Sequence, residues 1–186
     1  MNGIKFIRDL GRLCEYVYRK GVADAASSGD NAEITRIAER EDNYTTYIFL
    51  NDENGEDIKE SFYLDYLTVY CNKIKAYELR NFIIYSTGNS PMKRSLCTIV
   101  DYIYRKGLLD GKDVNRSDGL DYFANVDNGT FHHRLNGVKI PRIDWIEEIK
   151  HYINVISNYK RRAKVPNSMY SLSNYIGETI RNSKEL

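Results

Sequence analysis

A pattern of seven residues occurs twice in this chain, as EYVYRKG at positions 15–21 and as DYIYRKG at positions 101–107. The similarity extends on both sides, so that residues 8–24 lie over residues 94–110 with a constant offset of 86 positions. In both copies apolar residues recur at the i, i+3, i+7 spacing of a helix that buries one face. The sequence therefore predicts two helical units related by internal duplication.

Each copy of the pattern ends in Arg-Lys-Gly, which is typical of the end of an α-helix. Cations in the last turn interact favourably with the exposed carbonyl groups, and a following glycine readily adopts the left-handed conformation that terminates many helices. We therefore expect one helix to end at Gly21 and a second to end at Gly107.

The two units continue to match beyond the repeat, less closely and with a one-residue gap, until each enters a long amphipathic segment at 61–85 or 143–162. Strand signals are few, and the strongest is YTTYIFL followed by the turn-like NDENG. The predicted fold class is all-α: two tandem helix-turn-helix-like helical units plus a C-terminal helix, with one candidate short β-hairpin near 44–58.

The predicted organisation has three parts. Residues 1–88 would form a degenerate repeat unit, residues 89–165 a helix-turn-helix unit, and residues 166–186 the C-terminal helix. The first part contains 11 Lys/Arg and 15 Asp/Glu, whereas residues 89–186 contain 16 and 11, so their net charges are −4 and +5. Units built alike but charged oppositely are expected to do different work.

Composition excludes several classes of protein. Three cysteines (Cys14, Cys71 and Cys97) without a CxxC pair predict reduced thiols and a cytoplasmic location, not a disulfide framework or a zinc site. No apolar run approaches the roughly 18 residues that a membrane span needs. The sequence lacks a phosphate-binding loop, a GxSxG motif and a Cys/His nucleophile pair, so neither an enzyme nor a cofactor is expected.

The second unit contains a more specific pattern, LDYFANVDNGTFHHRLNG at 120–137. It resembles the helix-turn-helix of phage-repressor (Cro-like) DNA-binding domains. The family's apolar first position, turn residue and capping residue fall on Leu120, Asn125 and Asp127. An Asn tolerates the left-handed turn between helices, and an Asp can cap the helix that follows.

Two positions depart from the family pattern. Asp121 stands where Ala is usual, and Arg134 stands where an apolar residue is commoner. The resemblance otherwise implies that the segment from Asn128 to Asn136 forms a recognition helix, with Phe131 and Leu135 anchoring its inner face.

The partner that the resemblance implies is double-stranded DNA, and the implied role is that of a transcriptional repressor of phage or mobile-element type. The candidate DNA-binding residues are Asn128, Gly129, Thr130, His132, His133, Asn136, Lys139, Arg142, Lys160, Arg161, Arg162 and Lys164. Arg105 and Lys106 are further candidates for phosphate contacts. His132 and His133 are adjacent, which makes them a poor chelating pair on a helix, so no metal site is expected.

The first unit has acidic residues where the second would meet phosphates, and acid there repels DNA. We therefore expect it to pack against the second unit or to bind protein. The alternative function is that of an anti-CRISPR or other anti-defence inhibitor, which would bind a host nuclease or other nucleic-acid enzyme through residues 30–60. The sequence leaves the oligomeric state open, a homodimer included.

Overall fold

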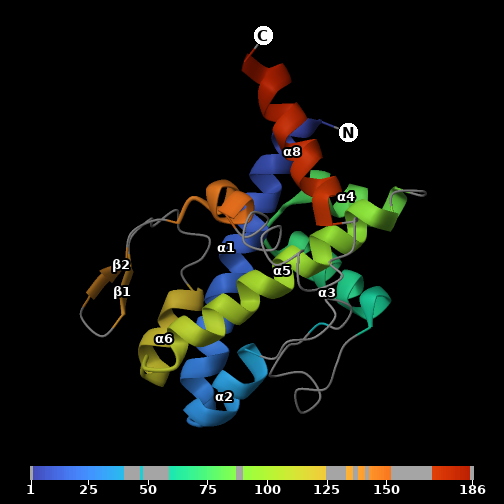
Figure 1. The fold of residues 1–186 in the computed structure, drawn as a ribbon. Coiled ribbons are helices and arrows are strands. Elements are labelled where there is room, and N and C mark those ends of the chain that lie inside the picture. The colour runs from blue at the N-terminus through green and yellow to red at the C-terminus, as the bar shows by residue number, and fades with distance from the viewer. Residues whose placement is uncertain are drawn as a thin grey trace.

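The computed structural model describes residues 2–39, 47, 59–86, 90–124, 133–135, 138–140, 143–151 and 169–184. These residues are mainly helical, which confirms the predicted all-α class (Figure 1). In chain order the elements are α1 (Gly3–Ser28), α2 (Asn31–Ala38), α3 (Glu60–Lys73), α4 (Tyr77–Tyr85), α5 (Ser90–Gly111), α6 (Arg116–Ala124), β1 (His133–Leu135), β2 (Val138–Ile140) and α8 (Met169–Lys184). Residues 145–151 are also helical. The hairpin predicted near 44–58 lies outside the described residues, apart from Tyr47.

The predicted helix ends at the two YRKG copies are wrong. α1 continues through Gly21 as far as Ser28, and α5 continues through Gly107 as far as Gly111. The residue that ends α1 is Gly29, whose φ of 72° lies in the left-handed region that favours glycine. Gly21 and Gly107 must therefore have a different role.

That role is the close crossing of α1 and α5, the two long helices at the centre of the molecule (Figure 1). A Cβ atom on Gly21 would lie 2.5 Å from the carbonyl oxygen of Tyr104, and one on Gly107 would collide with the carbonyl oxygen of Tyr18. Real side chains do not approach backbone atoms so closely. The repeated glycine thus allows the two copies of the repeat to pack directly against each other.

Polar contacts around the crossing are reciprocal. The hydroxyl of Tyr18 donates to Asp110 at 2.6 Å, and the hydroxyl of Tyr104 donates to Asp24 at 2.7 Å. Each tyrosine is 86 positions from the other, and so is each aspartate, so each unit supplies the donor for the other unit's acceptor. Within each helix Lys20 pairs with Asp24, and its equivalent Lys106 pairs with Asp110.

The two units also share one apolar core. The cluster of buried hydrophobic residues runs from Phe6 in α1 to Ile176 in α8 and includes members of both units. Helix α6 of the second unit packs on α1, because the guanidinium of Arg19 lies 4.5 Å from the ring centre of Tyr122 and donates to its carbonyl oxygen. Residues 2–38 thus pack directly against α5 and α6.

The amphipathic segment predicted at 61–85 is divided into α3 and α4. Lys75 has a φ of 57°, which interrupts the helix between them. α4 then begins beside α1, where a carboxylate oxygen of Asp9 accepts hydrogen bonds from the backbone N–H groups of Glu78 and Leu79 at 2.9 and 3.3 Å. A buried carboxylate is therefore used to satisfy the first turn of a helix from another part of the chain.

We expect Gly21→Ala to destabilise the protein and Gly11→Ala to stabilise it. Both glycines lie inside α1, but a Cβ on Gly11 meets nothing within 4 Å. Alanine in place of Gly11 should raise the free energy of unfolding by about 0.5–1 kcal/mol, because alanine has the higher helix propensity. At Gly21 the forced separation of the helices should cost about 1–3 kcal/mol. Urea unfolding measures both, and equal effects at the two sites would contradict the close crossing.

We also expect Tyr104→Phe to cost more stability than Tyr18→Phe. The acceptor of Tyr104 is the buried Asp24, whereas the side chain of Asp110 is 43% exposed. Loss of a hydrogen bond to a buried carboxylate typically costs about 1.5–3 kcal/mol, and water can replace part of a bond to an exposed one. The free energies of unfolding of the two variants provide the comparison, and the reverse order would count against these bonds.

Candidate nucleic-acid interface

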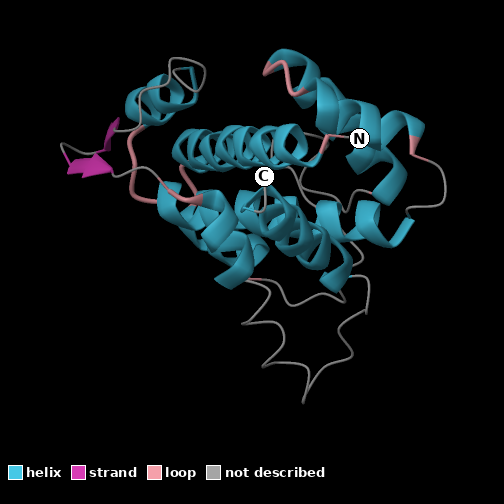
Figure 2. Ribbon diagram, turned by 90° about the horizontal axis from the view of Figure 1, so that it is seen from above, coloured by secondary structure: helices cyan, strands magenta, loops and turns pink. Residues whose placement is uncertain are grey.

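The second unit contains a β-hairpin at the edge of the helical body (Figure 2). Its two strands are antiparallel, and the directly opposed residues are His133 and Ile140, Arg134 and Lys139, and Leu135 and Val138. The recognition helix predicted over 128–136 is therefore wrong for residues 133–135, which form a strand.

The sequence contains the reason for this difference. The paired ends of the strands, Leu135 and Val138, are separated only by Asn136 and Gly137. Asn-Gly is the preferred connection of a two-residue hairpin, because both residues tolerate the positive φ that such a turn requires. As a sequence, Leu-Asn-Gly therefore fits a strand followed by a two-residue hairpin connection as well as it fits the end of a helix-turn-helix.

The register places two cations directly opposite each other. Arg134 and Lys139 form the central pair of the hairpin. Like charges in directly opposed positions of paired strands are destabilising by themselves, so this pairing is favoured where an anion is bound.

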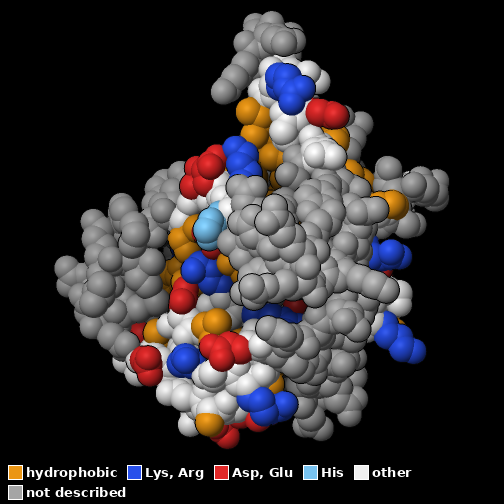
Figure 3. All heavy atoms as spheres, in the orientation of Figure 1, with side chains coloured by type: hydrophobic (Ala, Val, Ile, Leu, Met, Phe, Trp, Pro, Cys, Tyr) orange, Lys and Arg blue, Asp and Glu red, His pale blue; other side chains and the backbone are white. Residues whose placement is uncertain are grey.

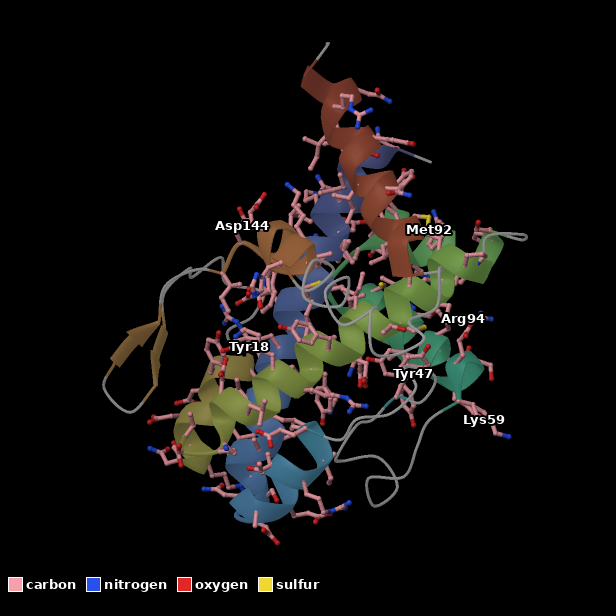
Figure 4. All side chains as sticks on the ribbon, in the orientation of Figure 1. Tyr18, Tyr47, Lys59, Met92, Arg94 and Asp144 are labelled. Atoms are coloured by element: carbon pink, nitrogen blue, oxygen red, sulfur yellow. The ribbon has the colours of Figure 1, made fainter. Side chains whose placement is uncertain are left out.

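The segment that follows the hairpin is attached to α1. The side chain of Asp144 accepts from the backbone N–H groups of Ile146 and Glu147, both at 3.2 Å, and so caps the helix at 145–151 (Figure 4). The indole N–H of Trp145 donates to Glu15 at 2.5 Å. The other carboxylate oxygen of Glu15 accepts from Arg19 at 2.7 Å. Glu15 thus connects the helix at 145–151 with α1.

Two predicted phosphate contacts are engaged within the protein. Arg105 is buried and pairs with Asp101 at 2.7 Å, and Lys106 lies 3.6 Å from Asp110. The burial of Arg105 in this ion pair does not fit its predicted role as a phosphate contact. The equivalent Arg19 in the first unit is likewise buried and paired.

The tyrosines of the two repeat copies are packing residues. Tyr16, Tyr18 and Tyr104 are buried, and Tyr102 is partly buried against the core. Burial, together with the nearby carboxylate of Glu148, raises the pKa of Tyr102 to about 12. These rings do not offer exposed faces on which bases could stack.

Helix α6 buries a different face from the one that the helix-turn-helix pattern indicates. Gly119 and Tyr122 are buried, whereas Leu120 is exposed. The predicted DNA-binding residues His133 and Lys139 lie in β1 and β2. The others lie outside the described residues, namely Asn128, Gly129, Thr130, His132, Asn136, Arg142, Lys160, Arg161, Arg162 and Lys164.

The part of the chain that the structure describes contains no group of three His, Cys, Asp or Glu residues placed to hold a metal ion. No described helix is both long and apolar enough to cross a membrane. The three cysteines are free and buried, and burial raises the pKa of all three thiols, that of Cys71 to about 12.

Comparison with other proteins adds no relative. No protein-family model, curated protein or solved structure matches this chain.

Trp145, the single tryptophan of the chain, can report on the attachment of the segment after the hairpin, since its side chain is buried. We expect Glu15→Ala to shift its fluorescence emission to longer wavelength and to increase quenching by acrylamide, because the indole loses its acceptor. Glu147→Ala is the matched control, since the side chain of Glu147 is 65% exposed and pairs only with Lys150 among the described contacts. Unchanged emission in Glu15→Ala would refute the attachment.

Proposed function

We propose that this protein binds double-stranded DNA through the β1–β2 hairpin and the basic residues near it in the sequence. The observation that carries the proposal is the directly opposed pair of Arg134 and Lys139. Two cationic residues in directly opposed positions of paired strands are compensated when a phosphodiester lies against them. The net charge of +5 on residues 89–186 favours the same partner.

A hairpin is as suitable for this purpose as a recognition helix. The major groove of B-DNA is about 12 Å wide and admits either an α-helix or a two-stranded β-ribbon. Arg and Lys are the side chains that most often contact guanine edges and phosphates there. The departure of Arg134 from the helix-turn-helix pattern therefore supports DNA contact once the segment is a ribbon.

The regulatory role in the proposal is repression of transcription by occupancy of an operator, as the resemblance to phage repressors implies. A second candidate is inhibition of a host nucleic-acid enzyme through the acidic first unit. The observation that favours it is the exposure of Asp30 and Glu39 at the two ends of α2. Sequence-specific binding to DNA supports the first role, whereas capture of a nuclease together with binding that ignores DNA sequence supports the second.

The test is a salt-titrated anisotropy assay of the whole protein on a labelled duplex of roughly 30 base pairs. We expect Arg134→Gln/Lys139→Gln to lower the slope of log K against log salt by about 2, since each phosphate contact contributes about 0.9. The same variant should unfold at equal or slightly higher urea concentration, because it removes a like-charge pair. This separates lost binding from lost folding.

The matched control is Lys59→Gln/Lys73→Gln, which removes the same charge from exposed positions at the two ends of α3. Figure 4 shows Lys59 on the side of the molecule away from the hairpin. The salt slope of this control variant should equal that of the unchanged protein. Absence of binding to any duplex at roughly 50 mM salt would overturn the proposal, because phosphate contacts are strongest at low salt.

A further inference from the structure

A line of three cations runs along the exposed face of α1 before the repeat begins. Lys5, Arg8 and Arg12 have the i, i+3, i+7 spacing that places residues on one side of a helix. All three are exposed, and the side chain of Arg8 is 63% exposed. We call these three residues the α1 basic stripe.

The stripe is not neutralised by the described part of the protein. Within that part neither Lys5 nor Arg12 makes an ion pair, and Arg8 has one contact of 3.6 Å, to Asp9. Asp9 is itself buried and binds the N-terminal turn of α4 with its other carboxylate oxygen. By contrast, Arg19 and Lys20, later in the same helix, both pair with carboxylates.

The second unit provides an internal comparison. The residues 86 positions after the stripe are Pro91, Arg94 and Thr98. Arg94 pairs with Glu60 at 3.3 Å, and the hydroxyl of Thr98 donates to a backbone carbonyl of its own helix. The α1:α5 scaffold therefore does not require a cation at each of these positions, which favours a partner outside the chain for the stripe.

The α1 basic stripe lies on the same face of α1 as the residue that binds the segment after the hairpin. One further turn along the same face of α1 lies Glu15, which accepts from Trp145. Trp145 follows the last strand residue, Ile140, by five positions. Five residues of extended chain span at most about 18 Å, so the two residues lie no farther apart than that. From Lys5 to Arg12 the helix rises about 10.5 Å. Both surfaces therefore lie within reach of one duplex, whose helical turn is about 34 Å.

Charged and apolar side chains are distributed on α1 in a way that favours nucleic acid over a lipid surface. A helix that lies in a membrane interface presents a wide apolar face to the lipid. The apolar face of α1 instead faces the core, where Phe6, Leu10 and Leu13 are fully buried. Figure 3 shows Lys and Arg groups beside Asp and Glu, together with apolar areas, among the described residues of the visible face.

We propose that Lys5, Arg8 and Arg12 contact the phosphate backbone of the same duplex whose groove receives the β1–β2 hairpin. This inference rests on the proposed function and adds a second contact surface to it, supplied by the unit whose overall charge is negative. Contacts at two places on one duplex fix the orientation of the hairpin in the groove, whereas a hairpin alone could pivot about its own axis.

The experiment compares Lys5→Gln/Arg8→Gln/Arg12→Gln with Lys59→Gln/Lys73→Gln/Lys93→Gln in the same anisotropy titration. Both variants lose three positive charges, so any effect of total charge is equal. We expect the stripe variant to reduce the salt slope by about 2–3, which corresponds to three phosphate contacts, and to weaken binding at least tenfold at roughly 100 mM salt. The control variant should keep at least half of the affinity.

The outcomes separate the two proposals. If the unchanged protein binds DNA and the stripe and control variants have the same slope, the stripe inference is overturned and the proposed function stands. If the unchanged protein binds no duplex, both are overturned. Binding of the unchanged protein to vesicles of anionic phospholipid, lost in the stripe variant while the affinity for DNA is kept, would assign the stripe to lipid and also overturn the inference. Circular dichroism of both variants confirms that each remains folded.

Discussion

The close approach of α1 and α5 at Gly21 and Gly107 determines how the rest of the molecule packs. Because a side chain at either position would collide with backbone of the facing helix, the two helices can cross closely only with glycine there. That closeness brings the reciprocal tyrosines and aspartates within hydrogen-bond distance. It also lets α6 reach across to α1, where Arg19 binds Tyr122. A glycine in mid-helix is costly by itself, so its duplication indicates a packing role.

The helical class and the C-terminal helix could be predicted from the sequence because both depend on local sequence patterns. The true ends of α1 and α5 could not be predicted from the two YRKG copies. The local sequence Arg-Lys-Gly is the same whether its glycine ends a helix or allows two helices to cross closely. Only the partner distinguishes the two cases, and that partner is 86 residues away. The break between α3 and α4 at Lys75 also involves a residue distant in the chain. α4 begins where a carboxylate oxygen of Asp9, in α1, accepts hydrogen bonds from the N–H groups of its first turn.

The candidate interface shows a different limit of sequence reasoning. Phe131 and Leu135, four residues apart, fit one face of a helix, but Leu135, Asn136 and Gly137 also fit a strand and its turn. When both periods fit a short segment, turn chemistry decides, and Asn-Gly favours the hairpin. The stripe was missed for another reason. The acidic total of the first unit conceals three cations gathered on one helical face, because a sum over residues contains no information about where they lie.

The reciprocity of the Tyr18–Asp110 and Tyr104–Asp24 bonds has a consequence for the order of folding. During synthesis α1 is complete long before α5 emerges, so its glycine-lined surface has no helix to pack against for more than 60 residues of elongation. Contacts between residues so distant in the chain carry a loop-closure entropy cost that must be met before they add stability. The crossing of α1 and α5 can form only once α5 has been synthesised, so the contacts of Tyr18 and Gly21 with the second unit cannot stabilise the first unit before that.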